Sequence, residues 1–337
     1  MLTTVQDCGR HGWQHVGVVP SGAMDCDSLK LANALVGNSL DQAGLEITLR
    51  GPTLLFQCDT LLALTGAQFS ARLNIGGHEL PCPLNRPVLL HAGDRLSIDQ
   101  PLHGFRAYLA IAGGIDVVPT LGSRCTYLAA AMGGFQGRAL KKGDSLRLGG
   151  DAHELAHARF DQLDRDSTTA DTQLHSVRWS VAPRSLPRDE PTVVRFVDGR
   201  HRHFFTSEAL AAFETQSYSI SPQSNRMGYR MLGGQLDRLQ NNDILSEPTA
   251  LGTVQVPANG LPIVLMADHQ TTGGYAKIAE VITADIGRLA QLLPGQEVRF
   301  VRCILADARK LAQAEHQALH LAMQAIRLKY KLPTAGH

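Results

Sequence analysis

The chain has 337 residues, 44 % of them hydrophobic, and a net charge of +1 at pH 7. These values predict a soluble globular protein with one large domain or two of ordinary size, and they argue against nucleic acid or an anionic membrane as the main partner. No apolar run approaches the ~20 residues of a spanning helix, and residues 1–7 lack the features of a signal peptide, so we expect a cytoplasmic location.

Strand patterns dominate the chain, and helical periodicity is confined to a few segments. Helices are expected over residues 26–36, 208–213, 286–293 and 306–330. The side chains expected to cap the first three are Asp25, Ser207 and Asp285. Apolar residues alternate after a turn at 93–98, 143–148 and 295–300, which predicts a half-buried strand in each.

The two halves of the chain repeat several features at a nearly constant offset. Glu46 and Glu247 lie 201 positions apart (247 − 46), and Gly93 and Gly295 lie 202 apart (295 − 93). Such agreement suggests two related β-domains in tandem. We predict an N-terminal β-domain, a polar linker with room for one short helix, and a C-terminal β-domain that carries the last helix, with the boundaries 1–150, 151–190 and 191–337.

The segment 246–275 is a candidate ligand-binding region. Two apolar runs, 253–256 and 263–267, are joined by an Asn-Gly-Leu-Pro turn, which predicts two neighbouring strands. The second run continues into Asp268, His269, Gln270, Thr271, Thr272, Gly273 and Gly274. Small hydrogen-bonding side chains followed by glycines suit a loop whose backbone approaches a ligand closely, and a plain polar loop is the alternative interpretation.

Two motifs place an arginine among polar residues and glycines. In residues 4–25, Arg10 has the geometry to bind a carboxylate or phosphate through two hydrogen bonds, with Asp7 holding it in place. A structural Asp–Arg pair beneath a turn explains this motif equally well. In residues 221–230, Arg226 stands among hydroxyls and an amide before a glycine, which again fits an anionic group.

Other patterns carry less weight. The glycine-rich segment 133–138 lacks the spacing of a P-loop. His153 and His157 have the spacing of a zinc-protease helix, but they fall in the predicted linker and no third ligand is evident, so no metal site is predicted. The six cysteines contain no Cys-x-x-Cys pair and fit reduced thiols, and Cys8 has no evident base that would make it a nucleophile.

In combination, these motifs resemble the biotin-dependent carboxyltransferase, or allophanate hydrolase subunit 2, family, and within it the C subunits of bacterial ATP-dependent 5-oxoprolinases. The matching stretches are VQDxGR at 5–10, SGAMD at 21–25, SNRMGYR at 224–230, SEP at 246–248 and QTTGGY at 270–275. The chain departs from the family pattern at Cys8, where leucine is frequent, and at Ala276, where proline is usual.

The resemblance implies a mainly β chain with a few helices, folded as two tandem cyclophilin-like β-barrel domains. It implies ATP-dependent opening of the lactam of 5-oxo-L-proline to L-glutamate, in a tight complex with the B subunit of that enzyme and together with its A subunit. ATP is then a co-substrate of the complex. The chain has no Met-Lys dipeptide for biotin attachment, so no biotin is expected on it. The alternatives are a biotin-dependent carboxyltransferase acting on urea or a related amide, and a regulatory binding subunit without catalysis.

For such a reaction, Arg10 and Arg226 are expected to hold the substrate carboxylate or a phosphate. Asp25 or Asp268 is the candidate general base. The side chains expected to orient the substrate by hydrogen bonds are Ser21, Gln270, Thr271 and Thr272. The remaining residues of the predicted substrate-binding set are Gln6, Asp7, Ser224 and Asn225.

Overall fold

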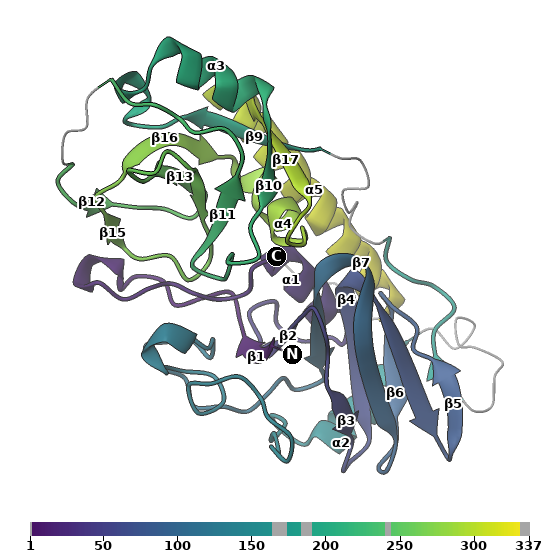
Figure 1. Ribbon diagram of the computed structural model, residues 1–337. Coiled ribbons are helices and arrows are strands. Elements are labelled where there is room, and N and C mark those ends of the chain that lie inside the picture. Colours follow the sequence, from purple (N-terminus) through teal and green to yellow (C-terminus); the bar gives the residue numbers. More distant parts are fainter. Residues whose placement is uncertain (1, 164–173, 183–190, 240–243, 331–337) are drawn as a thin grey trace, which may run out of the picture. The chain divides into compact units, whose positions relative to one another are not determined.

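The computed structural model describes residues 2–163, 174–182, 191–239 and 244–330, and Figure 1 shows its elements. This part of the chain is mostly β, as predicted, and it contains five α-helices, four of them in the predicted places. It divides into two compact units. Unit 1 comprises Met1–Gly9, Asp25–Leu186 and Gln317–His337, and unit 2 comprises Arg10–Met24 and Pro187–His316.

Unit 1 is built on an eight-stranded sheet. Its strands are β1 (Leu2–Gln6), β2 (Gly44–Thr48), β3 (Thr53–Leu55), β4 (Thr60–Ile75), β5 (His78–Pro81), β6 (Val88–Leu90), β7 (Arg95–Ile111) and β8 (His175–Ser176). The order is β1-β2-β7-β4-β6-β8, with β3 paired to β7 and β5 to β4. The long β4 and β7 pair antiparallel from Leu62↔Ile111 to Asn74↔Arg95, and their alternating apolar residues contribute much of the core of the unit.

Two helices cover this sheet. The first, α1 (Cys26–Leu35), packs on β4 and β7, and Asp25 caps it as predicted by accepting a hydrogen bond from Ser28 N. The second, α2 (Ala152–Gln162), packs on β4 and β6. The predicted linker 151–190 therefore contains a packed helix, and its residues 164–173 and 183–190 lie outside the described chain.

Unit 2 contains a closed barrel, in agreement with the predicted barrel fold. Its strands are β9 (Thr192–Asp198), β10 (Ser217–Ile220), β11 (Gly228–Leu232), β13 (Thr253–Val256), β14 (Ile263–Leu265), β16 (Ala276–Val281) and β17 (Glu297–Arg302). They close in the order β10-β11-β14-β13-β16-β9-β17. The predicted neighbours β13 and β14 pair antiparallel, and the core of the unit holds a stacked pair of rings, Phe213 and Phe300, whose centroids lie 4.6 Å apart.

Three more helices form where they were predicted, but their first and last residues differ from the predicted ones. For α3 (Ser207–Thr215), the cap is Thr206, not Ser207. The helix α4 (Thr283–Ala290) begins before Asp285, so Asp285 lies in its first turn and not at the cap position. The buried carboxylate of Asp285 accepts hydrogen bonds from Arg195 instead. The last helix, α5 (Leu305–Lys329), spans the predicted range.

Two sequence predictions differ from the structure. Residues 143–148 form no regular strand; an ion pair between Arg138 and Asp144 holds a turn there, and only Leu148 makes an isolated bridge, with Ile115. The units also cross the predicted boundaries, because residues 10–24 cluster with unit 2 and the chain from Gln317 onward with unit 1. None of the described helices is long and apolar enough to cross a membrane.

Candidate functional site

A short two-stranded sheet in unit 2 joins two of the motifs found in the sequence. Its strands are β12 (Glu247–Pro248) and β15 (Thr272–Gly273), paired antiparallel (Figure 1). Thr249 extends the contact, since its N–H donates to the carbonyl of Thr271 at 3.0 Å. The Ser-Glu-Pro and Gln-Thr-Thr-Gly-Gly-Tyr motifs therefore form one local structure.

Lys277 of β16 points its ammonium group at this small sheet. Its Nζ donates to Glu247 Oε1 at 2.9 Å and to the carbonyl of Pro248 at 2.6 Å, and the residue is only 4 % exposed. A buried ammonium is tolerated when it is paired and hydrogen-bonded. The Lys277 hydrogen bond is also the main cause that lowers the pKa of Glu247.

A buried histidine, His201, contacts both Lys277 and Glu247. The Nδ1 atom of His201 accepts a hydrogen bond from the backbone N–H of Lys277 at 3.2 Å, and its Nε2 lies 3.4 Å from Glu247 Oε1. This arrangement places the proton on Nε2 of a neutral ring. Burial is the main cause that lowers the pKa of His201, and the carboxylate of Glu247 opposes it.

Gln255 brings an amide to the same place. It lies opposite Lys277 in the β13–β16 pairing, is 2 % exposed, and its Nε2 has no hydrogen-bond partner among the described residues. A Cβ placed on Gly273 would lie 2.6 Å from that Nε2 and 3.0 Å from Nε2 of Gln270. A glycine is required where two amides approach the backbone so closely. A buried donor without a partner is uncommon and points to a ligand that takes its hydrogen bond.

Three predicted residues lie beside this cluster. Gln270 and Thr272 are exposed and Thr271 is half-buried. Gln270 approaches Gly273 and the carbonyl of Thr271 pairs with Thr249. The predicted loop is therefore accessible and lies next to Lys277 and Gln255.

Just before the loop in the chain, Asp268 forms a buried ion pair with Arg226. The guanidinium donates through Nε to Oδ2 at 2.9 Å and through Nη2 to Oδ1 at 3.0 Å, and Nη2 also donates to the carbonyl of Gly22. The hydroxyl of Ser21 donates to Asp268 Oδ1 at 2.6 Å. An external anion would have to displace a carboxylate bound by two hydrogen bonds, so the anion-binding role of Arg226 and the general-base role of Asp268 stay predictions.

The other predicted residues of unit 2 make local contacts. Arg10 is fully buried, and its backbone N–H donates to the carbonyl of Pro20. Ser224 Oγ accepts the N–H of Arg230 at 3.0 Å, and Asn225 Oδ1 accepts the N–H of Met227 at 2.8 Å. These bonds shape the turn that leads into β11.

The predicted residues of unit 1 also have partners within their unit. The amide of Gln6 donates to the carbonyl of Thr126 at 3.1 Å. Asp7 accepts hydrogen bonds from Gly9 N at 2.8 Å and from Ser123 Oγ at 2.7 Å. Asp25 accepts both the N–H and the hydroxyl of Ser28. Each carboxylate or amide thus has a structural role, and the general-base role of Asp25 stays a prediction.

Comparison with known proteins places the fold in a family. The family described as carboxyltransferase domain, subdomain A and B, matches residues 16–302. The chain belongs to this carboxyltransferase family. The resemblance predicted from the motifs is therefore confirmed.

Among curated relatives, the chain is 42 % identical to the C subunit of 5-oxoprolinase from Escherichia coli (strain K12) over 321 residues, which cover 94 % of this chain and 93 % of the relative. It is 32 % identical to urea amidolyase of Lachancea kluyveri, covering 94 % of this chain and 17 % of that protein. The crystal structure of the K. lactis urea amidolyase superposes with a TM-score of 0.82 at 31 % identity, over 95 % of this chain and 19 % of that one. The chain thus spans less than a fifth of these amidolyases.

Three members of the cluster were not predicted as site residues: Lys277, Gln255 and His201. Lys277 and Gln255 lie in short strands of which almost every residue is buried, and in the sequence each is a polar residue between two apolar neighbours. The signal in the sequence was a lysine between Ala276 and Ile278, because a lysine that a strand buries needs a partner. Their meeting with Glu247 depends on barrel closure, which no local pattern reveals.

Proposed function

We propose that this chain is the C-type subunit of an ATP-dependent 5-oxoprolinase. The observation that carries the proposal is the 42 % identity to the C subunit of the Escherichia coli 5-oxoprolinase, which extends over nearly the whole of both chains. In the proposed reaction, water breaks the lactam C–N bond of 5-oxo-L-proline and L-glutamate is released, driven by ATP hydrolysis. The chain would act in a complex with the B and A subunits of that enzyme.

The cluster around Lys277 has the chemistry that this substrate needs. 5-Oxoproline carries a carboxylate and an amide, and an oxyanion develops on the lactam oxygen when water attacks. The Lys277 ammonium has three N–H donors, and Glu247 and Pro248 take two of them in the described chain. We assign the third to the substrate carboxylate or the developing oxyanion, where a fixed positive charge lowers the barrier.

The neighbouring groups then take supporting roles in the proposal. The amide of Gln255 would donate to an oxygen of the substrate, because its Nε2 is buried without a partner in the described residues. Gln270, Thr271 and Thr272 would orient the substrate by hydrogen bonds. The ion pair of Arg226 and Asp268 would hold the loop that carries these three residues.

An omission assay tests the proposal. The chain is mixed with the A and B subunits from the same source, 5-oxoproline and ATP, and glutamate is measured with each component left out in turn. We expect glutamate only in the complete mixture. Glutamate release that continues at the same rate without this chain would overturn the proposal.

Carboxyl transfer to urea is the second candidate, favoured by the TM-score of 0.82 to a urea amidolyase. It is tested by supplying a biotinylated carrier protein, biotin carboxylase, bicarbonate, ATP and urea, and measuring urea-dependent ADP formation. Turnover of urea but not of 5-oxoproline would favour this function. A stable complex with the partner subunits that turns over neither substrate would favour the regulatory alternative.

A further inference from the structure

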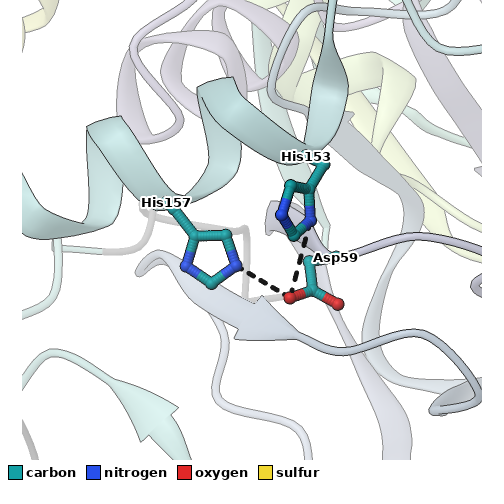
Figure 2. Close-up of side chains that lie close together, drawn as sticks. All are labelled: Asp59, His153 and His157. Atoms are coloured by element: carbon teal, nitrogen blue, oxygen red, sulfur yellow. Dashed lines mark hydrogen bonds and ion pairs between the residues drawn. The ribbon is translucent and has the colours of Figure 1, made fainter.

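A group of histidines surrounds one carboxylate in unit 1 and includes none of the residues assigned to the substrate. Asp59 Oδ2 lies 2.7 Å from His157 Nε2, 3.0 Å from His91 Nδ1 and 3.7 Å from His153 Nδ1. Figure 2 shows both histidines of α2 pointing toward Asp59. In the described part of the chain, Asp59, His153 and His157 are the one group of three histidine, cysteine, aspartate or glutamate side chains whose possible ligand atoms all lie within 4.8 Å of one another.

The fold explains why these residues meet. His153 and His157 are one helical turn apart on α2, and Asp151 caps this helix by accepting the N–H of Glu154. Their ring centroids are 4.8 Å apart. Ala152 and Ala156 are buried, so the helix is fixed against β4 and β6. The two imidazoles are therefore held by a packed element.

The carboxylate is fixed by the sheet. Asp59 immediately precedes β4 and His91 immediately follows β6, and the register Thr60↔Leu90 sets them opposite each other. The second oxygen of Asp59 accepts the backbone N–H of Ala92 at 3.0 Å. Asp59 Oδ2 is thus presented to the histidines of α2, and hydrogen bonds to a ligating carboxylate are the usual support of a metal site.

We propose that His153, His157 and Asp59 bind a divalent transition-metal ion such as Zn²⁺. Two imidazole nitrogens and one carboxylate oxygen are ligands that Zn²⁺, Ni²⁺ and Cu²⁺ prefer, whereas Mg²⁺ and Ca²⁺ need more oxygens. A tetrahedral ion with bonds of ~2.0–2.1 Å separates its donor atoms by roughly 3.3 Å. The observed 2.7 Å and 3.7 Å to Asp59 bracket that value.

The bound ion ties α2 to the start of β4. It replaces the hydrogen bond between His157 and Asp59, and both histidines bind as neutral imidazoles. His91 then acts as a positioning residue for the carboxylate. This site is independent of the 5-oxoprolinase proposal, because it uses none of the residues assigned to the substrate.

The test uses the full chain without an affinity tag, stripped with a chelator and titrated with ZnCl₂ by calorimetry under reducing conditions. We expect one Zn²⁺ per chain, and an affinity at least about 100-fold lower in Asp59→Asn and in the double variant His153→Gln/His157→Gln. The matched control is His316→Gln/His320→Gln, which removes two exposed histidines of the same spacing from α5; its affinity should be unchanged. MgCl₂ should give no heat of binding at this site.

A second readout excludes loss of fold and binding by thiols. Thermal unfolding with and without Zn²⁺ should show a stabilisation in the wild-type chain that is absent in both Asp59 and histidine variants, and X-ray absorption should show nitrogen and oxygen ligands only. Equal Zn²⁺ affinity in the wild-type and Asp59→Asn chains, sulfur ligands from the cysteines, or no bound Zn²⁺ would overturn the proposal.

Discussion

The ammonium of Lys277 lies 2.9 Å from the carboxylate of Glu247, and the lysine side chain is 6 % exposed. The two residues come from different strands, β16 and β12, and the strand pair β12–β15 puts the Gln270–Thr272 loop beside them. Because an isolated buried charge is costly, the lysine depends on this one carboxylate. Removing either charge should therefore affect both the stability of unit 2 and the chemistry beside the loop.

Replacing Glu247 by glutamine should destabilise unit 2 by about 2 kcal/mol, less than for a fully buried pair because Glu247 is partly exposed. The reason is that Lys277 keeps its charge and loses its counter-charge. Urea unfolding measures the change. The control is Arg200→Gln, since Arg200 is 75 % exposed and lies 3.3 Å from the same carboxylate; its effect should stay below about 0.5 kcal/mol. Equal effects of both variants would contradict the account.

Asp268→Asn should destabilise the protein by about 3 kcal/mol or more, because the guanidinium of Arg226 stays buried without its carboxylate. The matched control is Asp198→Asn, which breaks the exposed pair of Asp198 with Arg302 and should cost less than about 1 kcal/mol. Unfolding free energies of both variants give the comparison. An Asp268→Asn chain with unchanged stability but no glutamate release would instead support the general-base role.

Gly273→Ala should lower turnover of the reconstituted complex more than it lowers stability. The new Cβ would meet Nε2 of Gln255 at 2.6 Å and push the amide aside. The double variant Gly273→Ala/Gln255→Ala should therefore be no slower than Gln255→Ala alone. Losses that multiply in the double variant would show that the glycine and the amide act separately.

Stability should fall as the pH is lowered below about 6.5, partly because of His201. Burial lowers the pKa of His201 in the folded protein, with a smaller opposing effect of Glu247. The unfolded chain therefore takes up a proton first as the pH falls, so the contribution of the neutral ring is full above pH 6.5 and is lost as the pH drops through the folded pKa.

The measurement is urea unfolding at several pH values between about 5 and 7.5. His201→Asn should flatten the pH dependence, while His203→Asn, at an exposed position two residues away, should leave it unchanged. A stability of the wild-type chain that increases toward low pH would contradict the sign of this effect.

Local signals in the sequence were sufficient for much of the fold. The cap at Asp25, the period of α5 and the turn between β13 and β14 are each encoded within a few residues, and all three were predicted. A short helix was expected in the linker, but the place of α2 was not, because its exposed charged residues mask the two small buried alanines. The clustering of residues 10–24 with unit 2 was not predictable from the sequence. It depends on long-range contacts, such as the hydrogen bond from Arg226 to the carbonyl of Gly22, 204 residues away.

The candidate site was predicted only in part, because some of its residues meet only in the folded chain. The loop Gln270–Thr272 has a recognisable composition of small polar residues and glycine, whereas Lys277 and Gln255 are hidden in buried strands. Asp59 lies 98 residues from His157, and only the pairing of β4 with β6 and the packing of α2 bring them together. A segment of the sequence shows which residue types it contains, but only the fold shows which distant residues meet.

The most direct test of the central claim is the rate of ATP-dependent glutamate release by the reconstituted complex carrying Lys277→Met, compared with Lys310→Met, which changes an exposed lysine of α5. Pull-down with the partner subunits controls for assembly. We expect the Lys277 variant to assemble and to lose about 100-fold or more in rate, as for removal of one oxyanion donor, while the Lys310 variant keeps the wild-type rate. An assembled Lys277→Met complex that releases glutamate at the wild-type rate would contradict the account.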